Sequence, residues 1–108
     1  MNAWDIYSYD FPEAGPHPAV ITSSPERTSR KPWVSILLGS SQRASRAPGA
    51  TEVLLNGADG LDWETLLKCD VIHAVRKSDL QRKRGTVTPA RRRQIVQRMI
   101  ECNGWNRL

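Results

Sequence analysis

Apolar residues occur along the chain in short runs, and polar, proline-rich or glycine-rich segments separate them. The runs richest in aromatic and aliphatic side chains, and therefore typical of strands, are residues 4–11, 19–22, 33–38 and 51–55. The segments between them are predicted as loops. Residues 12–16 contain two prolines and a glycine, residues 23–31 are polar, and residues 39–49 lack apolar periodicity. The run at 33–38 is the strongest strand signal and is expected at the centre of the fold.

Residues 66–75 form a further apolar run, and their bulky aliphatic side chains predict a buried or half-buried strand. Asp70 lies within this run, where a buried carboxylate is costly without a partner. We therefore expect Asp70 either to be paired or to line a cleft. A short strand at residues 86–87 is expected to follow.

The segment after residue 87 has helical periodicity. Thr88 and Pro89 are typical of an N-cap and a first helical residue, and Gly104 is placed to end the helix. The predicted apolar face consists of Ile95, Val96, Met99 and Ile100. Three arginines at 91–93 act against the helix dipole, which indicates either a solubilising face or a contact with an acidic partner segment.

Short strands separated by turns, followed by one helix, predict a mostly β fold in one domain covering residues 1–108: an antiparallel barrel or sandwich with a C-terminal helix. No apolar run approaches the roughly 20 residues of a membrane-spanning helix. The N-terminal residues lack a signal-peptide pattern, so we expect a cytoplasmic protein. Cys69 and Cys102 lie in apolar patterns and are expected as buried free thiols. Without paired-histidine or CxxC spacing, neither a metal nor another cofactor is expected.

The net charge of +5 is unevenly distributed. Residues 1–60 carry five Lys or Arg and six Asp or Glu, whereas residues 61–108 carry eleven and five. This gradient favours either a polyanionic or acidic partner, or simply a solvated basic surface.

Two polar segments carry candidate chemistry, residues 15–18 and residues 40–43, and each adjoins an expected strand. His17 would supply an imidazole that titrates near neutral pH, and Arg43 a guanidinium suited to phosphate. Cleavage of RNA through its 2′-hydroxyl needs a base, an acid and a cation or donors at the phosphate, and it needs no metal. Residue types alone also fit a structural or simply exposed histidine between two prolines.

The segment GLDWETLLKCDVIHAVRKSDLQRKRG at residues 60–85 resembles the second half of the MazF/PemK toxins. In that family a strand with a Cys-Asp-x-Ile pattern precedes a Lys-Ser-x-Leu step, a Gly-Thr strand and a C-terminal helix. The resemblance extends over residues 4–11, 17–22, 40–43, 52–55 and 60–104. It implies an SH3-like antiparallel barrel of the MazF/CcdB type and a homodimer. It also implies metal-independent cleavage of single-stranded mRNA at short sequences, and neutralisation by an antitoxin with an acidic disordered segment.

The active site of that family uses an arginine directly before a Pro-Ala-Val strand, and a Thr or Ser in a polar loop after the central strand. Residues 18–20 match the strand, His17 stands in place of the arginine, and Ser41 matches the Thr. The resemblance therefore implies His17, Ser41 and Arg43 as catalytic residues, with Arg43 restoring the positive charge. The implied RNA-binding residues are Ser40, Gln42, Arg46, Arg82, Lys83 and Arg84.

Three further side chains enter through the same resemblance. His73 stands where the family often has Arg or Lys, and it could line the same cleft or be a core or surface residue. Trp63 or Tyr9 could stack an unpaired base. Because an imidazole replaces the arginine, two alternatives stay open. One is a non-catalytic barrel of the same type that binds RNA or a protein target such as gyrase; the other is a basic module that binds nucleic acid structurally.

Overall fold

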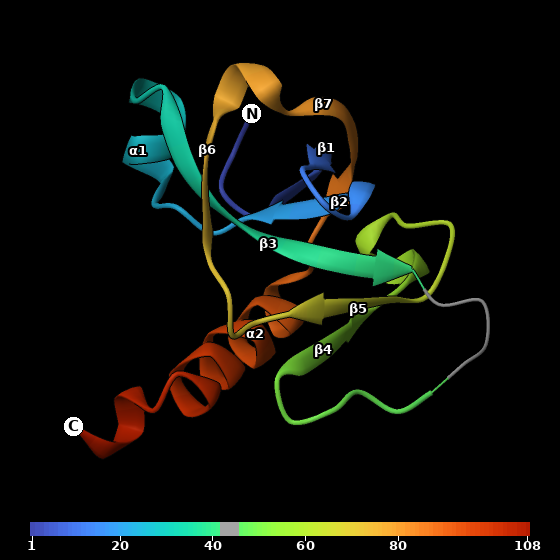
Figure 1. The fold of residues 1–108 in the computed structure, drawn as a ribbon, viewed down its shortest axis with the longest axis vertical. Coiled ribbons are helices and arrows are strands. Elements are labelled where there is room, and N and C mark those ends of the chain that lie inside the picture. The colour runs from blue at the N-terminus through green and yellow to red at the C-terminus, as the bar shows by residue number, and fades with distance from the viewer. Residues whose placement is uncertain (42–45) are drawn as a thin grey trace.

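A computed structural model describes residues 1–41 and 46–108. Its strands are β1 Asp5–Phe11, β2 Gly15–Ile21, β3 Trp33–Ser41, β4 Glu52–Leu55, β5 Thr65–Lys68, β6 His73–Arg76 and β7 Gln81–Thr86. The helices are α1 Pro25–Arg30 and α2 Pro89–Cys102, and 3-10 turns lie at η1 Gly57–Asp59, η2 Lys77–Asp79 and η3 Trp105–Arg107. All strand pairs are antiparallel, in the order β4-β5-β3-β2-β1-β7, with β6 also paired to β3. This seven-stranded sheet is not closed on itself, and with α2 at the C-terminal end (Figure 1) it confirms the predicted mostly β fold.

The central position predicted for the run at 33–38 is confirmed. β3 pairs with β2 along its middle, with β6 along its N-terminal half and with β5 at its C-terminal end. Figure 1 shows β3 crossing the middle of the molecule between these neighbours. The strand continues to Ser41, so the segment predicted as a loop from residue 39 begins as strand.

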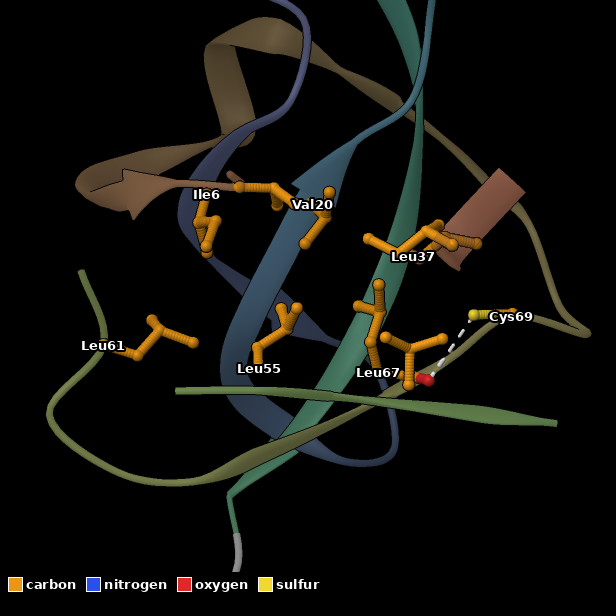
Figure 2. Close-up of a cluster of buried hydrophobic side chains, with 10 residues drawn as sticks. Ile6, Val20, Leu37, Leu55, Leu61, Leu67 and Cys69 are labelled. Carbon is orange, nitrogen blue, oxygen red and sulfur yellow. Dashed lines mark hydrogen bonds between the residues drawn. The ribbon is translucent and has the colours of Figure 1, made fainter. Parts of the chain in front are cut away.

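The sheet buries side chains on both faces, because alternate residues of a strand point to opposite sides. The helix-side cluster comprises Ile6, Val20, Leu37, Val53, Leu55, Leu61, Leu67, Cys69, Val87 and Ile95 (Figure 2). The Phe11 cluster comprises Phe11, Ala19, Ile21, Val34, Ile36, Val75 and Leu80. Consecutive residues of β2 and of β3 therefore belong alternately to the two clusters.

The two cysteines are free thiols, as predicted. Cys69 is buried in the helix-side cluster, and its Sγ donates a weak hydrogen bond to the Leu67 carbonyl at 3.6 Å (Figure 2). Burial raises the pKa of Cys69 to about 12, so this thiol carries no nucleophilic thiolate at neutral pH. Cys102 is only partly buried against the same cluster, and burial raises its pKa as well.

The run at residues 66–75 is two strands and not the single strand that its composition predicts. β5 ends at Lys68 and β6 begins at His73, and the two strands pair with opposite ends of β3. The chain bends between them, where Asp70 is exposed. The prediction of a carboxylate inside a buried strand is therefore wrong, because this connection lies at the surface.

Residues 15–18 lie in β2, although their prolines predict a loop. Pro16 and Pro18 stand opposite Asp10 and Ser8 of β1, two residues apart along the strand. Since strand residues alternate between the two neighbouring strands in their hydrogen bonding, both missing N–H groups fall on one edge of β2. The ladder to β3 on the other side of β2 begins only at Ala19. Because the two prolines are two residues apart, both lack an N–H on the same edge of β2, and the strand can contain them.

Residues 23–31 are also not the loop that their polarity predicts, because they contain α1. Ser24 caps this helix by accepting a hydrogen bond from the Arg27 N–H at 3.2 Å, and Pro25 occupies its first turn. Thr28 is buried, and Lys77 donates to its carbonyl at 2.6 Å. These tertiary contacts hold a helix that is too short to be stable alone.

α2 begins and ends where the sequence predicts. The Thr88 hydroxyl accepts from the Arg91 N–H, and Gly104 follows the helix with a φ of +73°. Ile95 is buried in the helix-side cluster, but Val96 is 43% exposed and does not share the buried face predicted for it.

The buried side chain of Asp59 joins the turn after β4 to the start of α2. One of its oxygens accepts from the Thr88 N–H at 3.1 Å. The other accepts from the Asn56 N–H at 3.0 Å and lies 3.5 Å from Nε of Arg91. A carboxylate at a helix N-terminus is favoured by the dipole, and Arg91 compensates a charge that has no access to water.

Two of the three arginines in the first turn of α2 therefore serve the fold. Arg91 pairs with Asp59, and Nε of Arg92 donates to the Val87 carbonyl at 2.9 Å. Arg93 is exposed and stays available to a partner.

We predict that Asp59→Ala lowers the free energy of unfolding by about 3 kcal/mol, because it leaves a partly buried guanidinium without its counter-charge. Urea denaturation followed by tryptophan fluorescence measures the change. The exposed Asp62 supplies the control, since Asp62→Ala should stay within about 0.5 kcal/mol of wild type. Equal losses in the two variants would contradict this role for Asp59.

Candidate functional site

His17 lies on β2 directly opposite Tyr9 of β1. Its Nε2 lies 3.0 Å from the Ala14 carbonyl oxygen, which can only accept, so Nε2 donates in this bond. The imidazole is half-buried, and its ring centroid lies 6.4 Å from that of Phe11 in an edge-to-face arrangement. His17 is thus held at the sheet by a backbone carbonyl and an aromatic ring.

The end of β3 lies beside this part of β2. A methyl group at Gly39 would lie 3.3 Å from the Pro18 carbonyl oxygen and 2.7 Å from Cγ2 of Thr65, so glycine allows the strands to approach closely. The register pairs Ala19 with Leu38 and ends there; counted on in the same register, His17 falls level with Ser40, one residue beyond the close approach of Pro18 and Gly39. The described parts of the two segments predicted to carry chemistry, residues 15–18 and 40–41, therefore adjoin each other as strand ends and not as loops.

The two serines at this strand end lie on different faces. By strand alternation, Ser40 shares the face of Leu38, which packs against the Phe11 cluster, whereas Ser41 shares the face of Gly39 and Thr65. Ser40 is half-buried and Ser41 is exposed. The serine next to His17 on the same face is therefore Ser40, and Ser41 reaches solvent at the rim. Gln42 and Arg43 lie outside the described residues.

Arg46 is engaged within the chain. It contacts both carboxylate oxygens of Glu52, at 2.9 and 3.0 Å, and the Gly49 N–H donates to the same carboxylate. These hydrogen bonds, that of Arg46 first, lower the pKa of Glu52 to about 2. Arg46 therefore fixes the segment before β4, and a phosphate would have to compete with Glu52 for it.

The predicted cationic run at residues 82–84 lies within β7, which starts five residues earlier than the short strand expected at 86–87. β7 pairs with β1, which separates it from His17 on β2. Arg82 is exposed, Lys83 lies 3.5 Å from the buried carboxylate of Asp5, and Arg84 donates to the Ser8 hydroxyl at 3.3 Å. The three cations therefore lie on the outer strand of the sheet, one strand away from β2, and two of them also support the fold.

Aromatic rings gather at the same place. The ring of Phe11 makes edge-to-face contacts with Tyr9 at 4.8 Å and with His73 at 5.2 Å between centroids, besides the contact with His17. His73 therefore contacts the same phenyl ring as His17. Tyr9 is half-buried, whereas Trp63 is 64% exposed. The contact between Phe11 and His73 joins β1 to β6, and no short sequence pattern signals it.

Within the described residues, no group of three or more His, Cys, Asp or Glu side chains is placed to hold a metal ion. None of the helices in this part of the chain is long and apolar enough to span a membrane.

The family model for the PemK-like, MazF-like toxins of type II toxin–antitoxin systems matches residues 2–102. The chain belongs to this family. Membership of the MazF-like toxins agrees with the sheet order and with the C-terminal helix, and it confirms the resemblance found in the sequence. The comparison with curated protein sequences gave no match.

Solved structures of MazF-like toxins have the same fold. A mycobacterial endoribonuclease in complex with its cognate antitoxin is 23% identical, with a TM-score of 0.80 over 96% of this chain and 95% of that chain. The Mycobacterium tuberculosis toxin MazF-mt6 is 16% identical, with a TM-score of 0.77 over 91% and 94% of the two chains. A MazE–MazF structure from Deinococcus radiodurans is 15% identical, with a TM-score of 0.73 over 96% and 95%. At these identities the likeness establishes the fold.

For this MazF-like chain, we predict a pH-dependent contribution of Glu52 to stability. Because the folded-state pKa of Glu52 is lowered, its stabilising effect is present above the ordinary value of 4.5 and is lost as the pH falls towards about 2. The melting temperature of wild type should exceed that of Glu52→Gln at pH 7, and the gap should close between about pH 4.5 and pH 2.

The exposed Glu13 provides the control, since Glu13→Gln should follow wild type at every pH. A gap between wild type and Glu52→Gln that stays constant down to pH 2 would show that the carboxylate charge is not what stabilises this segment.

Proposed function

We propose that this toxin is a metal-independent endoribonuclease that cleaves single-stranded mRNA at short sequences by attack of the 2′-hydroxyl on the adjacent phosphate. The observation that carries the proposal is the close approach of Pro18 and Gly39, which places the end of β3 beside the strand of His17, inside a fold shared with endoribonucleases. Ser40 shares the face of His17, and Ser41 stands exposed at the rim of the same strand end. An imidazole beside hydroxyl donors can take the 2′-proton while the donors bind the phosphate oxygens. Arg43 enters the proposal as the cation on that phosphate.

The replacement of the family arginine by His17 changes the chemistry available. Arginine keeps its proton at neutral pH, so it can hold a phosphate but cannot act as a base. Imidazole can accept the proton, and the positive charge must then come from other side chains. Arg43, which the family resemblance implies, and the cations of β7 are the proposed sources of that charge.

The first test is incubation of the purified protein with a long single-stranded RNA in EDTA. Wild type should release fragments with 5′-hydroxyl ends, and His17→Ala and Ser41→Ala should each lower the cleavage rate by about 10²-fold or more. Ser78→Ala, at an exposed serine of η2, should cleave like wild type. Intact RNA in every lane, with folded protein, would contradict the proposal and favour a non-catalytic toxin that binds RNA or a protein target.

The cationic edge of β7 is the proposed track for the RNA backbone. Arg82 is exposed, so Arg82→Ala should lower the slope of log K against log salt concentration by about 0.7 if it neutralises one phosphate. Lys83→Ala should lower both the slope and the melting temperature, because Lys83 also faces the buried Asp5. Fluorescence anisotropy with 2′-O-methyl RNA, which lacks the nucleophile, measures binding without cleavage.

The exposed Arg107 in η3 is the matched control for charge alone. Arg107→Ala should leave the salt slope unchanged. If Arg82→Ala and Arg107→Ala give the same slope, the β7 edge is not where the backbone binds.

An acidic segment of an antitoxin is the proposed protein partner. The mycobacterial endoribonuclease was solved with its cognate antitoxin, and the Deinococcus MazF with MazE. On this chain, Arg93 and Arg98, together with Glu101, line a surface groove of about 500 Å³ between α2 and Val53 of β4. Guanidinium groups along a groove suit carboxylates of an extended chain. A homodimer acting in the cytoplasm completes the proposal.

A further inference from the structure

The chain has two histidines, and both imidazole rings pack around one phenyl ring. The ring centroid of Phe11 lies 6.4 Å from that of His17 and 5.2 Å from that of His73, with both contacts edge-to-face. The two histidines are far apart in the sequence and lie on β2 and β6, which do not pair with each other in the described sheet. The fold alone therefore places both rings against Phe11.

Both rings lie on the face of the sheet that holds the Phe11 cluster. His17 stands opposite Tyr9, which packs against this cluster, and His73 stands opposite Ile36, which belongs to it. Each histidine is half-buried, so neither ring is cut off from solvent. The same face carries Ser40 by strand alternation. Both imidazoles therefore lie on one face of the sheet, each in contact with the ring of Phe11.

We propose that His73 is the general acid of RNA cleavage and His17 the general base, an inference that rests on the proposed ribonuclease function. The hydrogen bond to the Ala14 carbonyl supports the role of His17 as the base. It requires the proton of neutral His17 to be on Nε2, which leaves the lone pair of Nδ1 to accept a proton. His73 is then the second imidazole, and in its protonated form it has a proton to give.

The two imidazoles account for both proton transfers in the cleavage step. Nδ1 of His17 takes the proton of the 2′-hydroxyl while O2′ forms a bond to phosphorus. The bond from phosphorus to O5′ breaks, and His73 gives its proton to O5′. The products are a 2′,3′-cyclic phosphate and a 5′-hydroxyl, with no oxidant, metal or water consumed.

Charged and polar residues also flank the two histidines along their strands and the neighbouring strand. Tyr9 packs on Phe11, and Asp10 is exposed at the end of β1. On the other side, Asp70 is exposed before β6, and Arg76 stacks over Trp33 at 4.9 Å. Among the described residues on this face, the imidazoles are thus the groups whose type titrates near neutral pH.

The test is the pH dependence of cleavage in EDTA, with His73→Phe as the main variant because it keeps an aromatic ring against Phe11. Wild type should give a bell-shaped profile of kcat/KM. His73→Phe should lose the alkaline descent and about 10²-fold in rate, whereas His17→Ala should lose the acidic rise. His73→Gln serves if the phenylalanine variant does not fold, and Ile72→Ala, at an exposed neighbouring residue, should behave like wild type.

A second substrate separates an acid from a positioning residue. Once the wild-type cleavage position is mapped, an oligonucleotide with sulfur in place of the bridging 5′-oxygen there provides a leaving group that needs no proton. This substrate should restore His73→Phe to within about 10-fold of wild type and leave His17→Ala impaired.

Three results would overturn the inference. A His73→Phe profile that keeps both limbs would remove the imidazole from the chemistry. Failure of the sulfur substrate to rescue that variant would make His73 a structural residue. RNA left intact by wild type would overturn the ribonuclease proposal together with this one, whereas cleavage by wild type with an unchanged His73→Phe profile would overturn this one alone.

Discussion

The buried carboxylate of Asp59 is the constraint on which the arrangement of the second half of the chain depends. It accepts hydrogen bonds from the backbone on both sides, at Asn56 and Thr88, and it faces Arg91. A buried charge with this geometry cannot shift without losing its partners, and such a loss costs several kcal/mol. The backbone is equally tight there, since a methyl group at Gly85 would lie 2.1 Å from the Asp59 carbonyl oxygen. α2 is thereby fixed against the turn that leads into β5, and it closes the helix-side cluster.

β5 connects this constrained region to the candidate site. It pairs with the end of β3, where Thr65 presses against Gly39, and Gly39 lies against Pro18. The strand ends that carry His17 and Ser40 are thus held by backbone contact and not by long side chains. A site built on paired strands is more rigid than one built on loops, which suits proton transfer over short distances.

The sequence predicts the elements whose signals are local. Alternation and composition identify the strands up to β4, and the Thr88-Pro89 cap identifies α2. The predictions fail where tertiary contacts determine whether a segment forms a helix, a strand or a turn. The short helix α1 is stabilised by the hydrogen bond from Lys77 and by the burial of Thr28. The strand ends at Lys68 because β5 and β6 pair with different parts of β3. At the site, local pattern and resemblance indicate His17 and the serines, but only the fold relates His73 to Phe11.

Charge shows why composition alone is a weak guide to partners. Several of the cations behind the net charge of +5 already form ion pairs within the chain. Arg46, Lys83 and Arg91 each face a carboxylate of this chain. Charges already neutralised in this way release few counterions when a polyanion binds, so they add little to affinity. For the proposed RNA ligand, the exposed Arg82 is therefore the cation of β7 with the most to contribute, because Lys83 and Arg84 already have partners within the chain.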